Sequence, residues 1–249
     1  MSDFNRGFSS IPAGRADMAV DAGLRSFMLG VYNKVALGLV LSAALAWATT
    51  YFAPVRDLLY VTTSDGRLVG FTGLGMAARF APLVVLLVAM FGMRNPSPRS
   101  AGILYWSIVS LIGIGLGVWV LAYTGASVAT TFLITAAAFG GLSLAGYTTK
   151  KDLTGFGSFL IVGLFGLMIA MLVSFFVHLP GLSFAINVIG VFIFAGLIAY
   201  DTQRLKMSYY YLQGDTASLA IQTNFGALNL YLDFINLFQF LMNILGSRR

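Results

Sequence analysis

Long apolar runs separated by short polar connections dominate this chain. Seven runs approach twenty residues, the length that an α-helix needs to cross the hydrocarbon core of a bilayer. They cover residues 35–52, a second run ending at 93, and then 101–123, 127–146, 156–176, 182–200 and 227–245. The second run has the least certain start, because its clear part is short and any extension takes in Arg79, whose long side chain can reach a membrane surface. The pattern predicts an all-α integral membrane protein with seven transmembrane helices.

Composition supports membrane integration and excludes several other classes of protein. Of the 249 residues, 58% are hydrophobic and only 10% are charged, whereas soluble domains carry about 25% charged residues. The absence of cysteine excludes disulfides and thiolate metal sites. The single histidine, His178, cannot form a cluster, and we interpret it as an interfacial residue. The net charge of +6 is spread between the apolar runs, which argues against a nucleic-acid partner.

The distribution of Lys and Arg predicts how the chain is oriented. We divide it into a polar tail, residues 1–30, and a transmembrane bundle, residues 31–249. Basic residues concentrate in the tail and in the connections after the second, fourth and sixth runs. By the positive-inside rule, the N-terminus is expected in the cytoplasm, and seven crossings then place the C-terminus outside. No short apolar segment followed by a cleavage site marks a signal peptide.

Two acidic residues stand out because they adjoin or interrupt apolar runs. Asp201 directly follows the sixth run and Asp233 lies inside the seventh, where a charge costs roughly 2.5–3.5 kcal/mol on insertion scales. At about 100° per residue, Asp233 shares one helix face with the other polar residues of the last run, Asn229, Asn236, Gln239 and Asn243. Asn187 and Asp201 are close to four turns apart and also share a face. We therefore expect the two polar faces to meet inside the bundle.

The same geometry predicts a charged site near the cytoplasmic mouth. Asp201, Asp233 and Arg94, which closes the second run, are expected to converge there. Two carboxylates close together in a low dielectric do not both ionise near neutral pH, so the pair should titrate as a unit. Their oxygens would suit a divalent cation such as Ca²⁺, with Asp201 and Asp233 as ligands. The alternatives are that Asp201 only caps its helix in solvent, and that Arg94 is an ordinary positive-inside residue.

Three segments carry a resemblance to a known family. They are residues 123–160, residues 189–206 (IGVFIFAGLIAYDTQRLK) and residues 228–238 (LNLYLDFINLF). They resemble the Bax inhibitor-1 family, also called transmembrane Bax-inhibitor-motif proteins, and within it the bacterial YccA-like branch. The resemblance extends over all seven runs. Asn229 departs from the common pattern, which has Ser at this position.

The resemblance implies a fold, a function and a location. Six helices would surround a central seventh helix in a bacterial inner membrane. The protein would be a proton-sensitive leak for Ca²⁺ or another cation, not an enzyme, and would need no cofactor. Asp201 and Asp233 would form the carboxylate pair, with Arg94 as a latch to Asp201. Other bacterial relatives are linked to the membrane-bound AAA protease FtsH, which gives the alternative of a non-conducting protease regulator that uses the tail as a handle.

An enzymatic role is a more remote alternative. Intramembrane aspartyl proteases use Tyr-Asp on one helix and Gly-x-Gly-Asp on the next. Tyr200 and Asp201 match the first element, but Asp233 follows Tyr231 and Leu232, so the second element is missing.

Overall fold

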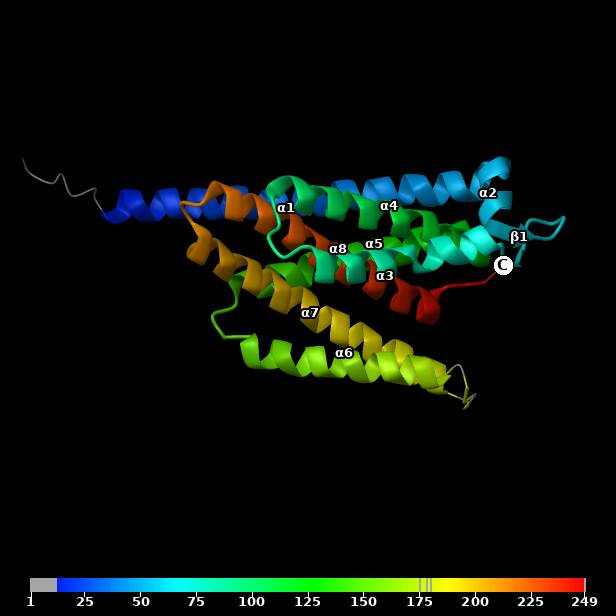
Figure 1. Ribbon diagram of the computed structural model, residues 1–249. Coiled ribbons are helices and arrows are strands. Elements are labelled where there is room, and N and C mark those ends of the chain that lie inside the picture. The colour runs from blue at the N-terminus through cyan, green and yellow to red at the C-terminus, as the bar shows by residue number, and fades with distance from the viewer. Residues whose placement is uncertain (1–12, 175, 178, 180, 249) are drawn as a thin grey trace, which may run out of the picture.

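The computed structural model describes residues 13–248 except 175, 178 and 180, and describes side chains from residue 22 onward (Figure 1). The interpretation of His178 therefore lies outside the described residues. The helices are α1 (Ala13–Tyr51), α2 (Ala53–Leu59), α3 (Gly73–Gly92), α4 (Pro98–Ala122), α5 (Gly125–Thr148), α6 (Thr154–Ser174), α7 (Leu182–Leu212) and α8 (Thr216–Leu245). The strands β1 (Tyr60–Thr62) and β2 (Leu68–Phe71) form one antiparallel hairpin.

Seven of the described helices are long and apolar enough to span a membrane, namely all except α2. They run alternately in opposite directions, so the start of α1 and the C-terminal end of the chain lie at opposite ends of the bundle (Figure 1). We call the end that holds the start of α1 and the α7–α8 connection the inner end, and the other the outer end. The prediction of a seven-span, all-α membrane protein is confirmed.

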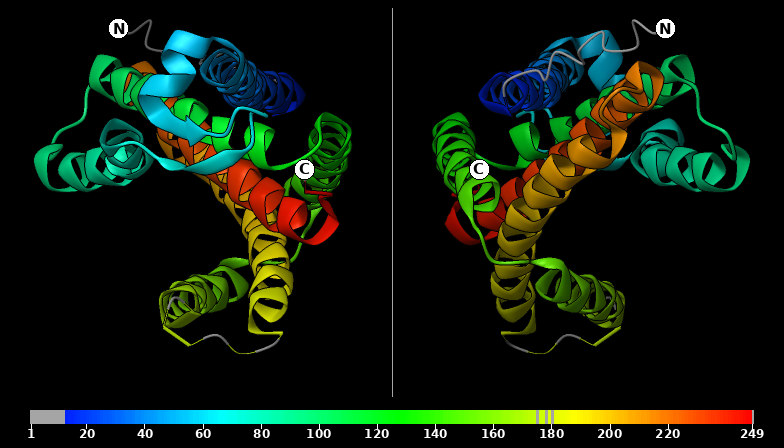
Figure 2. Two further views of the ribbon diagram at one scale, coloured as in Figure 1. Left: turned by 90° about the vertical axis from the view of Figure 1, so that its right-hand side faces the viewer. Right: turned by 90° about the vertical axis from the view of Figure 1, so that its left-hand side faces the viewer.

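Helix α8 is the centre of the bundle. It packs against α1, α4, α5 and α7, and it is the most buried of the spans. Helix α3 packs on α4 and helix α6 packs on α7, so these two lie further from α8 (Figure 2). A polar face on α8 is therefore enclosed by other helices, whereas α3 and α6 expose long apolar side chains such as Phe91 and Val162.

The outer end is closed by the β-hairpin and α2. Tyr60 pairs with Phe71 across the hairpin, and the hydroxyl of Tyr60 donates to the carbonyl of Ile114 on α4 at 2.9 Å. The guanidinium of Arg79 lies 5.0 Å from the centre of the Phe71 ring. The second span thus begins at Gly73, so the extension of the second apolar run that takes in Arg79 is part of the helix.

The predicted tail boundary at residue 30 lies inside a helix. Helix α1 begins at Ala13, and Leu24, Phe27, Met28 and Val31 are buried in the main core. Their spacing of three, one and three residues places them on one face of the helix, so burial against the bundle stabilises a segment of mixed polarity. Of the predicted tail, residues 1–12 lie outside the described residues. A deletion that tests a tail-bound partner should therefore stop at residue 12.

Helix α8 begins with a clear N-cap. Asp215 Oδ1 accepts hydrogen bonds from the N–H groups of Ala217 and Ser218 at 3.0 and 3.1 Å, and Oδ2 accepts from the Ser218 hydroxyl at 2.6 Å. The two N–H groups belong to the first turn of the helix, where backbone donors have no partner within the helix. The hydrogen bonds from Ser218, first through its side chain and then through its backbone, hold the pKa of the Asp215 carboxyl below its ordinary value.

We expect Asp215→Ala to lower the melting temperature of the purified protein at neutral pH. Because the folded state has the lower pKa, the stabilisation is present above the ordinary carboxyl pKa and is lost as the pH falls through the folded one. The difference between variant and wild type should therefore shrink below about pH 4. Asp65→Ala, in the exposed turn of the hairpin, is the matched control. A difference that is constant from neutral to acidic pH would contradict a charged cap.

Candidate functional site: an acid pair between α7 and α8

The carboxyl groups of Asp201 on α7 and Asp233 on α8 lie within hydrogen-bonding contact of one another. Asp233 is buried, with 6% of its surface exposed, and Asp201 is half-buried. Two carboxyl groups can share a hydrogen bond only when one of them carries a proton. The structure thus brings together the two acids that the sequence singled out, and we call them the acid pair.

The polar faces of α7 and α8 meet at a second point nearer the outer end. Asn243 Nδ2 on α8 donates to Asn187 Oδ1 on α7 at 3.1 Å. Asn236, between the two contacts, instead donates to the carbonyl of Leu232 in its own helix at 2.8 Å. The two polar faces therefore adjoin, as expected, at the acid pair and at the Asn187–Asn243 contact. The side chain of Asn236 instead forms its hydrogen bond within α8.

Asp201 does not cap its helix. Helix α7 continues for eleven residues beyond it to Leu212, and α8 begins at Thr216, well before the predicted start at residue 227. The extensions hold together because side chains on both helices pack in the main core, among them Leu205 and Tyr209 on α7 and Phe225 on α8. The alternative of a solvated helix-end carboxylate is thus wrong for Asp201.

The acid pair lies inside the bundle relative to the inner ends of neighbouring helices. Asn224 Nδ2 on α8 donates to the carbonyl of Pro98 at 3.4 Å, which places the first residue of α4 level with Asn224. Asp233 is nine residues further along α8, or about 14 Å. Gln203 contacts the α5–α6 connection through hydrogen bonds to Lys151 and Leu153, and Asp201 lies two residues beyond Gln203 toward the outer end.

Arg204, not Arg94, is the cation that acts on the acid pair. Arg204 follows Asp201 by three residues on α7, and its charge interacts with the Asp201 carboxyl. Arg94 is exposed in the α3–α4 connection and forms no ion pair within the described part of the chain. The predicted convergence of Arg94 with the two acids is therefore not seen, because α3 packs mainly on α4, at the edge of the bundle.

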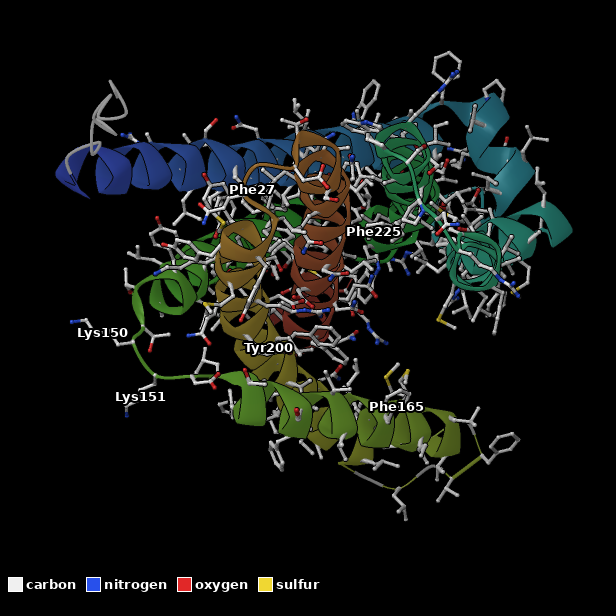
Figure 3. All side chains as sticks on the ribbon, turned by 60° about the vertical axis from the view of Figure 1, so that its left-hand side comes forward. Phe27, Lys150, Lys151, Phe165, Tyr200 and Phe225 are labelled. Atoms are coloured by element: carbon white, nitrogen blue, oxygen red, sulfur yellow. The ribbon has the colours of Figure 1, made fainter. Side chains whose placement is uncertain are left out.

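A cavity of about 300 Å³ adjoins the acid pair. It is lined by Asp201, Arg204, Leu205, Gln222, Phe225, Gly226 and Asn229, and Phe225 can be located on α8 in Figure 3. This volume is ample for several water molecules, and the six lining residues other than Asp201 all lie on the inner side of the acid pair. We call it the acid-pair cavity. Asp233 is not among the lining residues, and Oδ2 of Asp233 has no hydrogen-bonding partner among the described residues.

The acid pair by itself offers few ligands for a tightly bound metal ion. Ca²⁺ takes six to eight oxygen ligands, and no group of three or more His, Cys, Asp or Glu side chains occurs among the described residues. Asn229, exposed to the cavity and without a hydrogen-bonding partner in the described structure, could add one oxygen. The arrangement suits brief contact with a hydrated cation better than a permanent site.

The sequence interpretation missed Arg204 and Gln222 as part of the site. It assigned Arg204 to a connection, because the apolar run stops at Tyr200 and the helix was expected to stop with it. The available signal was the spacing of Asp201 and Arg204, which at three residues makes them neighbours on a helix surface. Gln222 lies on a segment of α8 whose polarity resembles that of a loop, so only the structure reveals it.

The fold and the site define a class, a multi-pass α-helical membrane protein with two carboxyl groups in contact beside an internal cavity. The chain belongs to the Bax inhibitor-1 family, because the family model described as "Inhibitor of apoptosis-promoting Bax1" matches residues 24–249. This result confirms the resemblance seen in the sequence.

Three relatives show how far the similarity extends. The chain is 67% identical to an uncharacterized protein of Caulobacter vibrioides over the whole of both chains. It is 43% identical to an uncharacterized protein of Rickettsia prowazekii over 92% of each chain. It is also 42% identical to the inner membrane protein YbhL of Escherichia coli, over 94% of this chain and 98% of that one. The similarity therefore covers the acid pair and the whole bundle.

Proposed function

We propose that the protein is a pH-sensitive cation leak, with Ca²⁺ as the main permeant ion, in a bacterial inner membrane. The observation that carries the proposal is the contact between Asp201 and Asp233 at the wall of the acid-pair cavity. A buried pair of carboxyl groups is costly unless it is paired or protonated. Retaining two such groups in an apolar bundle is typical of ion and proton pathways.

The proposed mechanism starts from a pair that shares one proton. In this state the pair carries one negative charge, which Arg204 offsets in part from the same helix. Loss of the shared proton leaves two adjacent carboxylates that repel each other and attract a divalent cation. Water in the acid-pair cavity can hydrate that cation up to Asp201.

The pathway beyond the pair is closed in this conformation. A second cavity of about 240 Å³ reaches the outer half of α8 at Gln239 and is also lined by Arg79. Along α8 between Asp233 and Gln239, the buried side chains of Phe234, Leu237 and Phe238 belong to the apolar core. We propose that conduction requires α7 and α8 to move apart at the acid pair, which repulsion between the carboxylates would favour.

The proposed orientation places the inner end in the cytoplasm. The α3–α4 connection carries Arg94 and Arg99, and the α5–α6 connection carries Lys150 and Lys151, all at the end from which α1 starts (Figure 1). An excess of Lys and Arg in short loops is typical of the cytoplasmic side. The acid pair would then respond to cytoplasmic pH through the acid-pair cavity.

Flux measurements on the purified protein test the proposal. Liposomes that contain the protein and a trapped Ca²⁺ indicator should admit Ca²⁺ faster than protein-free liposomes, at a rate that changes with pH between about 5 and about 8. Ca²⁺ entry equal to that of protein-free liposomes at every pH in this range would overturn the proposal.

Two arginine variants distinguish the cation that acts on the pair. We expect Arg204→Gln to shift the pH at which flux is half-maximal upward, because removing a nearby positive charge makes the shared proton harder to lose. Arg94→Gln is the matched comparison and should leave that midpoint close to the wild-type value, since Arg94 is exposed and away from the pair. A midpoint that moves with Arg94→Gln and not with Arg204→Gln would contradict the assignment.

A further inference from the structure

Another cavity, distinct from the acid-pair cavity, lies at the inner end and is lined by positively charged side chains from two separate parts of the chain. It measures about 550 Å³ and lies between the α5–α6 connection and the last turns of α7. Lys150 and Lys151 come from the connection, and Arg204 and Lys206 come from α7. Its apolar and aromatic wall is formed by Tyr200, Met207 and Tyr211. We call this cavity the basic pocket.

The connection that carries the two lysines is fixed to α7. Gln203 Nε2 donates to the carbonyl of Lys151 at 2.8 Å, and Gln203 Oε1 accepts from the N–H of Leu153 at 2.8 Å. The ring of Tyr200 lies against Gly157 near the start of α6. Figure 3 shows Lys150 and Lys151 on this connection at the edge of the bundle, with Tyr200 on α7 beside α6. The lysines are thus held at the rim of a defined pocket.

The positive charge of the basic pocket is only partly offset, because its lining has four basic side chains and one acid, and Arg204 also interacts with Asp201. The one acid that lines it, Asp152, is engaged by the start of α6, where Thr154 donates its hydroxyl and its N–H at 2.6 and 2.8 Å. These bonds, the hydroxyl first, hold the pKa of the Asp152 carboxyl below its ordinary value. The only ion pair among the described residues is Arg56–Asp57 at the outer end.

The basic pocket lies at the membrane boundary, which indicates that an anionic ligand of this pocket would come from the lipid. Phe156 and Phe159, on the first turns of α6 directly after the connection, are 48% and 70% exposed, as expected for side chains that face lipid. Lys206 Nζ donates one hydrogen bond to the carbonyl of Tyr147 and lies 5.0 Å from the centre of the Tyr147 ring. An ammonium group has three N–H donors, so two remain for a ligand. Basic pockets between spans at this level are typical of sites for anionic lipid headgroups.

We propose that the basic pocket binds a phosphate group, presented by the headgroup of an anionic phospholipid. Lys150 and Lys151 at the rim, with Arg204 and Lys206 on α7, supply the donors, and Tyr200, Met207 and Tyr211 contact the apolar part of the lipid.

The proposed site is linked to the acid pair through one side chain. Arg204 lines both the basic pocket and the acid-pair cavity. A bound phosphate group would compete with Asp201 for this guanidinium, so lipid composition would adjust the proton affinity of the acid pair. This consequence rests on the proposed function, whereas the binding itself does not.

Native mass spectrometry of the detergent-purified full chain tests binding without any flux measurement. We expect wild type to retain phosphatidylglycerol in preference to phosphatidylcholine, and Lys150→Gln/Lys151→Gln to weaken that binding by on the order of tenfold or more. Arg67→Gln/Arg99→Gln removes the same charge at two exposed positions outside the pocket and should bind like wild type. Lys150→Arg/Lys151→Arg keeps the charge and should retain binding, which shows that the connection still folds.

The outcomes separate the possible sources of the phosphate group. Binding of phosphatidylglycerol that inorganic phosphate does not displace supports a lipid headgroup. Displacement by inorganic phosphate at low millimolar concentration supports the same site with a soluble ligand. Equal retention by wild type, the Lys→Gln pair and the control pair would show that the lysines only set topology and would overturn the proposal. Failure of the flux experiment would leave this result unaffected.

Discussion

Asp233→Asn should remove the pH dependence of Ca²⁺ flux and lower its maximal rate by at least on the order of tenfold. The amide keeps the shape of the side chain but can neither lose a proton nor add negative charge beside Asp201. A cation next to one carboxylate in a partly buried site gains several kcal/mol, about 4 at 4 Å with an effective dielectric constant of 20. Losing even half of that interaction exceeds the 1.4 kcal/mol that corresponds to tenfold.

Comparison of the single and double variants tests whether the two acids act as a unit. Asp201→Asn should have an effect similar to that of Asp233→Asn, and the double variant should be little worse than either, because groups that share one proton are not additive. Asp57→Asn, an exposed acid at the outer end, serves as the control. Single variants that keep the wild-type midpoint would show that the acid pair does not set the pH response.

Gly146→Val should destabilise the protein by about 3 kcal/mol, the upper part of the range for overpacking. Gly146 on α5 is buried, and a Cβ atom there would meet the backbone of Ala199 on α7, with the Ala199 Cα at 2.8 Å. Backbone atoms cannot move aside as a flexible side chain can. The two helices would have to separate next to Asp201, which would also disturb the hydrogen bond from Thr202 to Ser143. Thermal unfolding in detergent should show a melting temperature lower by roughly 6–12 °C.

The same helix provides the control for this substitution. A Cβ atom at Gly141 would have no neighbouring atom within 4 Å, so Gly141→Val changes the chemistry equally without a clash. Its melting temperature should stay within a few degrees of the wild-type value. Similar losses of stability in both variants would mean that valine is poorly tolerated in α5 generally, and that the close approach of α5 and α7 does not matter.

The acid pair could be predicted from the sequence because the free-energy cost of placing a charge in an apolar segment depends on that segment alone. Asp233 interrupts an apolar run, and any such charge must find a polar partner or a proton whatever the rest of the fold does. The helical period then selected Asn187 as sharing the face of Asp201, and Asn243 as sharing that of Asp233. The contact between the two helices fits these faces at both the Asp201–Asp233 and Asn187–Asn243 pairs.

The identity of the partner cation could not be predicted in the same way. Arg94 and Arg204 both end or follow apolar runs, and hydropathy alone treats them alike. Which of them lies near Asp201 depends on the packing of α3 against α4 and on the continuation of α7 to Leu212. The basic pocket also requires the hydrogen bonds of Gln203, which join residues about fifty positions apart in the chain.

The sequence by itself determined the membrane class, the number of spans and the two acids, because a hydrocarbon core imposes a length and a charge penalty on each segment independently. Only the tertiary structure decided where α1, α7 and α8 begin and end at the inner end of the bundle. There the segments are of mixed polarity, and their helical state depends on mutual burial of residues such as Leu24, Leu205 and Tyr209. The continuation of α7 to Leu212 also decided that Arg204 lies beside Asp201, since that continuation depends on burial of α7 side chains against other helices.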